Sequence, residues 1–138
     1  MTGNEYVIAS MRTNDGKNTE RMIKAVTDSL INHCQLACAG NSEDRKDLGG
    51  IVDACLGLSG EVGEFNDMIK KWIFHEKSLD EEHAKKEMGD IMWYVAMMCY
   101  SFGWDMDEIL QMNIDKLKAR YPEGFDVNKA NNRKEGDI

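Results

Sequence analysis

The sequence predicts an all-α protein, and three observations lead to that prediction. Only one of the 138 residues is proline, Pro122, so almost nothing in the chain interrupts a helix. Apolar residues recur at intervals of three and four over long stretches, which is the spacing of one face of an α-helix. Glycines and capping residues stand where those stretches begin or end. We therefore expect four to five helices.

The expected helices follow one another with short connections. They cover, in chain order, residues 19–40, a segment that Gly49 and Gly50 lead into and whose apolar positions run from Cys55 to Trp72, and residues 78–103 and 105–122. Gly40 and Gly103 stand where C-terminal stops belong, because glycine readily adopts the left-handed conformation that ends a helix. Two pairs have the form of a capping box at a helix start: Ser78 with Glu81, and Asp105 with Glu108.

The length corresponds to one domain, which we expect at residues 19–122. Residues 1–18 are expected to form an extended or loosely ordered lead-in, and residues 123–138 a polar tail. No N-terminal segment has the features of a secretory signal, and no apolar run is long enough to span a membrane, so we expect a cytoplasmic protein.

The four cysteines are expected to be buried thiols in a reducing compartment. The spacing of Cys34 and Cys38 beside His33 also suggests zinc, but a second ligand pair of finger-like spacing is missing from the sequence. Core packing is therefore the favoured interpretation for these residues.

The chain is acidic, with 25 Asp and Glu residues against 17 Lys and Arg and a formal net charge of −8. Such a chain repels a phosphate backbone, so we expect no nucleic-acid partner. If the protein handles phosphates, it needs metal ions or a local cationic cluster to offset its own charge.

Two pairs of acids, Glu61 with Glu64 and Glu87 with Asp90, are each spaced i, i+3 and share a helix face. If a short turn makes these two helices antiparallel, the four carboxylates meet at one level on one side of the pair. Four crowded carboxylates resist ionising together unless cations bind, and oxygen ligands alone suit Mg²⁺ or Mn²⁺. The alternative is four solvated acids on a helix surface.

A second cluster consists of Asn113, Lys116 and Arg120, which share one face of the last helix and are suited to hold a polyphosphate. Lys71 is a further candidate. The alternative is a set of cations placed favourably at a helix C-terminus.

Together these motifs resemble the MazG-like nucleoside triphosphate pyrophosphohydrolases. The resemblance rests on residues 57–64, 87–90, 93–94, 113, 116–117, 120–122 and 124–125. It implies an all-α fold whose four-helix core is completed between protomers of a homodimer or homotetramer. It also implies Mg²⁺-dependent hydrolysis of a nucleoside triphosphate to the monophosphate and pyrophosphate.

The resemblance also implies roles for individual residues. The four acids match metal ligands. Our hypothesis for the mechanism is that either Glu61 or Glu64 also accepts the proton of the attacking water. Lys116 and Arg120 match phosphate contacts, and Tyr94 and Asn113 match substrate contacts. The alternatives are a non-enzymatic helical interaction module, or a relative specialised for dUTP, dCTP or a phosphoribosyl nucleotide. Base preference stays open.

Overall fold

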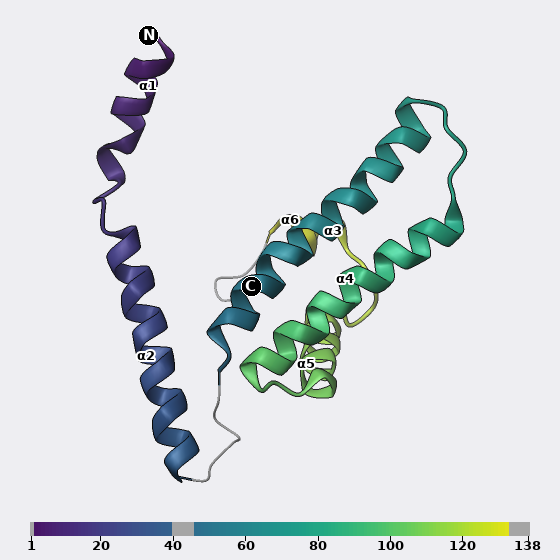
Figure 1. Ribbon diagram of the computed structural model, residues 1–138. Helices are drawn as coiled ribbons and strands as arrows, with labels where there is room; N and C mark the ends of the chain where they lie inside the picture. Colours follow the sequence, from purple (N-terminus) through teal and green to yellow (C-terminus); the bar gives the residue numbers. More distant parts are fainter. Residues whose placement is uncertain (1, 40–45, 133–138) are drawn as a thin grey trace.

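The computed structural model describes residues 2–39 and 46–132, and all regular structure in these ranges is helical (Figure 1). The elements are α1 (Gly3–Ser10), the 3₁₀-helix η1 (Met11–Thr13), α2 (Asn18–Ala39), α3 (Leu48–Phe74), α4 (Glu81–Phe102), α5 (Met106–Arg120) and α6 (Val127–Asn131). The predicted all-α class is confirmed. No helix among the described residues is both long and apolar enough to cross a membrane.

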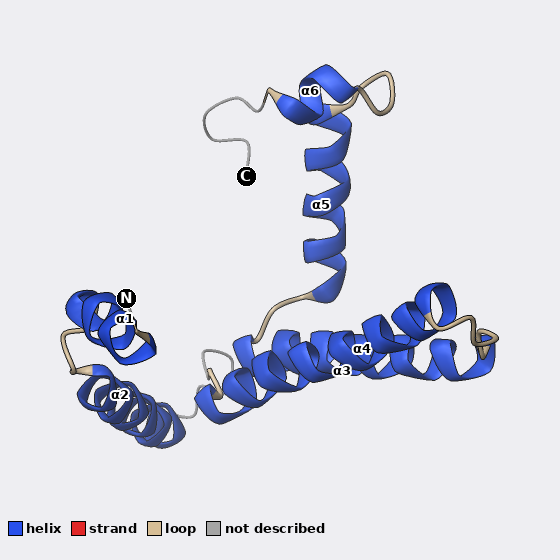
Figure 2. Cartoon of the chain, turned by 90° about the horizontal axis from the view of Figure 1, so that it is seen from above, coloured by secondary structure: helices blue, strands red, loops and turns tan. Residues whose placement is uncertain are grey.

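The centre of the fold is an antiparallel hairpin of α3 and α4, which lie side by side along most of their length (Figures 1 and 2). Ala54 is fully buried and Cys99 is 7% exposed near the end of the hairpin away from the turn. The same end is closed by the backbone N–H of Asp47, which donates to the carbonyl of Ser101 over 2.8 Å. This hairpin is the scaffold on which both acidic pairs stand.

The start of α4 differs from the sequence prediction. Its N-cap is Asp80, whose carboxylate accepts the backbone N–H of His83 over 3.0 Å, whereas Ser78 lies outside the helix. The Asp80 carboxylate, two residues closer to the first turn than Ser78, satisfies a free helix N–H. The Ser78 hydroxyl is therefore left without that role. The N-cap at Asp105 and the left-handed stop at Gly103, with φ of 69°, agree with the prediction.

The N-terminal lead-in is also a correction, because residues 3–10 form helix α1 instead of an extended segment. Thr2 and Glu5 make a capping box: the Glu5 N–H donates to the Thr2 hydroxyl over 3.2 Å, and the Thr2 N–H to Glu5 Oε2 over 2.6 Å. These reciprocal bonds satisfy two helix N–H groups and favour a helix start that apolar periodicity alone does not reveal. The predicted stop at Gly40 lies outside the described residues.

The remaining helices stand away from the hairpin. α1 and α2 form a separate arm in Figure 1, and α5 rises from the hairpin with α6 at its far end in Figure 2. Cys55 is exposed, which corrects the prediction of a buried thiol, because the face of α3 that carries it is uncovered. The side chains of His33, Cys34 and Cys38 lie outside the described part of the chain.

This arrangement leaves an unusually large surface. The accessible area is 11449 Å². A compact monomer of 15.7 kDa exposes about 7300 Å², so the excess is about 4100 Å². Large apolar side chains contribute to that surface on several helices, among them Leu30, Leu56 and Met112, which are 60%, 70% and 64% exposed.

Candidate metal centre

Three of the predicted acids come together on one side of the α3–α4 hairpin. Glu61 comes from α3, and Glu87 and Asp90 come from α4. Each offers a carboxylate oxygen, and these oxygens all lie within 4.8 Å of one another. The antiparallel hairpin explains this meeting, because residues 61 and 90 are equally distant from the turn and so lie at the same height.

Glu64 lies outside this group of three, although it is close enough to interact with it. Burial raises the pKa of Glu61, and repulsion from the charges of Glu64, Asp90 and Glu87 raises it further. A carboxyl group whose ionisation is opposed by three neighbouring carboxylates lies in a strongly negative field. All four predicted acids therefore contribute to one electrostatic site.

Glu87 is the most buried member of the cluster, at 7% exposure. Its Oε1 lies 2.7 Å from Nε2 of His83, one helical turn earlier. Its Oε2 is buried and has no hydrogen-bond partner among the described residues. A buried carboxylate oxygen without a donor is costly, and a bound cation would satisfy it. The donor set, which is carboxylate oxygen only, fits a hard divalent cation such as Mg²⁺ or Mn²⁺.

His83 is a residue that the sequence reasoning missed. The signal was present, since His83 precedes Glu87 by four residues and the two therefore share a helix face. The spacing alone does not show that the imidazole reaches the carboxylate.

The predicted basic residues are not gathered around the acids within one chain. Lys71 forms an ion pair with Asp67, as does Lys70, and these two lysines hold the pKa of Asp67 at about 2, below its usual range. Lys116 and Asn113 stand on α5, which leads away from the hairpin (Figure 2). Arg120, at the end of α5, places its guanidinium 5.4 Å from the centre of the Tyr121 ring.

Tyr94 faces the seam between the two hairpin helices. A Cβ atom added to Gly57 of α3 would overlap the Tyr94 ring, so the ring lies directly on the Gly57 backbone. The ring also meets Trp93 edge to face, with 4.9 Å between the ring centres.

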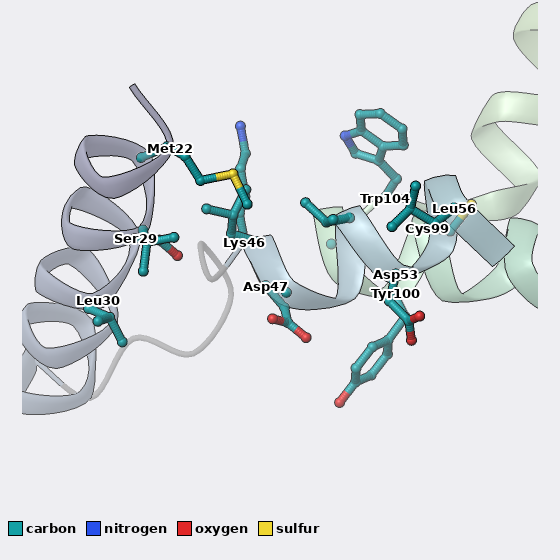
Figure 3. A pocket seen from close by; sticks show the side chains of 16 residues that line it. Met22, Ser29, Leu30, Lys46, Asp47, Asp53, Leu56, Cys99, Tyr100 and Trp104 are labelled. Atoms are coloured by element: carbon teal, nitrogen blue, oxygen red, sulfur yellow. The ribbon is translucent and has the colours of Figure 1, made fainter. Parts of the chain in front are cut away.

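A groove of about 1240 Å³ separates α2 from the end of the hairpin opposite the turn (Figure 3). Its lining is largely apolar and comes from α2, α3 and α4 and from the residues just before α3 and just after α4. Representative lining residues are Met22, Val26, Leu30, Leu56, Tyr100 and Trp104.

The fold and the acid cluster define an all-α protein with a candidate divalent-cation site on a helical hairpin. Residues 51–125 match the family model of the MazG nucleotide pyrophosphohydrolase domain. This match covers more than half of the chain, and the protein belongs to the MazG nucleotide pyrophosphohydrolase family. The matched region contains all four acids, α4 and α5.

A curated relative, the "Gene 37 protein" of Mycobacterium phage L5, is 28% identical over 94 residues. The aligned region covers 65% of this chain and 82% of the phage protein. No solved structure matches the chain.

Proposed function

We propose that this protein hydrolyses a nucleoside triphosphate to the nucleoside monophosphate and pyrophosphate in a Mg²⁺-dependent reaction, with Mn²⁺ as a substitute. The observation that carries the proposal is the convergence of Glu61, Glu87 and Asp90 within 4.8 Å, with a buried Glu87 oxygen that lacks a donor in the described part of the chain. The family match supports the same class of reaction.

In this proposal Glu61, Glu64, Glu87 and Asp90 hold the cation. The bound cation would neutralise the triphosphate and activate the attacking water. Either Glu61 or Glu64 accepts the proton of that water. The raised pKa of Glu61 supports its candidacy, because a carboxylate of higher pKa is a stronger base.

Lys116 and Arg120 are proposed to stabilise negative charge on the pyrophosphate leaving group, and Asn113, Tyr94 and Lys71 to contact the substrate. For Lys71 this requires exchange of its ion pair with Asp67 for one with a phosphate. Because α5 leads away from its own hairpin, its residues Asn113, Lys116 and Arg120 would act at the acids of a second copy of the chain.

A homodimer or homotetramer is the proposed assembly. The excess accessible surface of about 4100 Å² per chain, relative to a compact monomer, is more than the roughly 800 Å² per partner of a standard interface. The exposed apolar side chains and the groove beside α2 are the surfaces that a second copy would cover. We expect the protein to act in the cytoplasm, without a nucleic-acid or membrane partner.

The test is a pyrophosphate-release screen over canonical and modified nucleoside triphosphates, with Mg²⁺ or Mn²⁺. Glu64→Gln and Asp90→Asn should abolish turnover while the helical circular dichroism spectrum stays unchanged. The matched control is Glu81→Gln, which removes one charge from the first turn of α4. Unchanged pyrophosphate release in both site variants would refute the assignment.

A thermal melt with and without Mg²⁺ separates this proposal from a non-enzymatic interaction module. Ligand that binds only the folded state stabilises it by RT ln(1 + [L]/Kd), which is about 2.7 kcal/mol at 100 times Kd. A solvated acidic face should respond far less to Mg²⁺ at the same ionic strength.

A further inference from the structure

His83 and Glu87 make a close side-chain contact at the acid cluster. His83 Nε2 lies 2.7 Å from Glu87 Oε1, and the Glu87 side chain is only 9% exposed. His83 is itself anchored at the start of α4, because its backbone N–H donates to the N-cap carboxylate of Asp80 over 3.0 Å. This bond holds the His83 backbone in the first turn of α4, and the half-exposed imidazole reaches the carboxylate one turn further on.

The contact distinguishes the two oxygens of Glu87. Oε1 lies 2.7 Å from Nε2 of the imidazole, whereas Oε2 is buried and has no partner among the described residues. A carboxylate with one oxygen held by a donor cannot rotate freely about its last bond. Carboxylates that ligate metals are commonly held in this way, and their outer partners set the orientation of the ligand.

We propose that His83 is a positioning residue, whose Nε2–H holds Glu87 Oε1 and so leaves Oε2 available to the divalent cation. The inference rests on the proposed function, since it takes Glu87 as a cation ligand. His83 itself touches neither cation nor substrate in this role. Its loss is expected to weaken cation binding rather than to remove the reacting groups.

Two isosteric variants test which imidazole nitrogen matters. In His83→Gln the amide NH₂ can take the place of Nε2, whereas in His83→Asn it reaches only the place of Nδ1. His83→Ala removes both nitrogens. His75→Ala is the matched control, because His75 is the C-cap residue of α3 and lies in the connection before α4 begins at Glu81.

The primary measurement is the dissociation constant of Mg²⁺ and of Mn²⁺ for the full chain by titration calorimetry, without nucleotide and at one fixed pH. We expect His83→Ala and His83→Asn to weaken cation binding about 10- to 100-fold. For His83→Gln and His75→Ala the cation dissociation constants should stay within about threefold of the wild-type values. This is less than the tenfold change that about 1.4 kcal/mol produces.

Activity supplies the second readout. Saturating Mg²⁺ should restore kcat of His83→Ala close to the wild-type value, with the substrate KM unchanged. Equal cation affinity in the wild type, His83→Ala and His83→Asn would overturn the inference and leave the proposed function standing. A wild type that binds neither cation would overturn both.

Discussion

The ring of Tyr94 on α4 lies directly against the backbone of Gly57 on α3, where a Cβ atom would overlap ring atoms Cε1 and Cζ. This contact is one place where the two hairpin helices approach closely, and it lies about one turn from Glu61. The absence of a side chain at residue 57 therefore leaves room for the Tyr94 ring between the helices near the acids.

Gly57→Ala should destabilise the protein by about 1–3 kcal/mol, because the added methyl group forces the Tyr94 ring and the helices apart. The measurement is urea unfolding at fixed protein concentration. Gly60→Ala is the control on the same helix, since a Cβ there meets nothing within 4 Å. That substitution should stabilise the helix by about 0.5–1 kcal/mol, because alanine loses less backbone entropy than glycine. Equal effects of the two substitutions would contradict the packing described here.

Asp80→Ala should lower the free energy of unfolding by about 1 kcal/mol, because α4 loses its N-cap acceptor. Ser78→Ala should leave the stability nearly unchanged, since Ser78 lies outside the helix. Thermal unfolding of the two variants beside the wild type compares the two positions directly. A larger loss from Ser78→Ala would mean that the helix begins where the sequence alone predicted.

The ion pairs of Asp67 with Lys70 and Lys71 make a pH-dependent contribution to stability. Because the folded-state pKa of Asp67 is lowered from 3.8 to about 2, the contribution is present above pH 3.8 and is lost as the pH falls towards 2. Asp67→Asn should remove this contribution, so the stability difference between variant and wild type should shrink as the pH falls from 3.8 towards 2 and vanish below pH 2. Asp53→Asn, which removes a charge from the same helix away from these lysines, is the control. A stability difference between Asp67→Asn and wild type that is constant from pH 7 to pH 2 would contradict the prediction.

A charge placed on the apolar wall of the groove beside α2 should weaken self-association. Leu30 lines that groove and is 60% exposed, so Leu30→Glu should shift the protein towards monomer in sedimentation velocity. Thr27→Glu introduces the same charge on α2 outside the groove lining and should have a smaller effect. The melting temperature of an obligate oligomer also rises with protein concentration. A wild type that is monomeric at all concentrations would refute the proposed assembly.

Much of the candidate metal centre followed from periodicity. An α-helix turns by a constant angle per residue, so the spacing of Glu61, Glu87 and Asp90 along two antiparallel helices was enough to predict that they meet. Glu64 was expected at the same place, yet it lies outside the tight group. A side chain of several rotatable bonds takes its final direction from its neighbours, which periodicity does not describe.

The N-terminal helix α1 shows a second limit of what the sequence alone can predict. Its apolar positions have no helical spacing that stands out, and the capping box of Thr2 and Glu5 is the only local signal. The start of α4 was misjudged for a related reason, because Ser78 and Asp80 are both good capping residues and only the folded chain shows which accepts the helix N–H.

By itself, the sequence determined the helical class, the hairpin and the grouping of the acids, because these depend on the regular geometry of the backbone. The folded structure decided which partners within reach on the same helix each polar side chain takes: His83 lies against Glu87, and Asp67 pairs with Lys70 and Lys71. It also decided that α5 stands apart from its own hairpin (Figure 2). These outcomes depend on burial, rotamers and distances between elements, which local spacing does not specify.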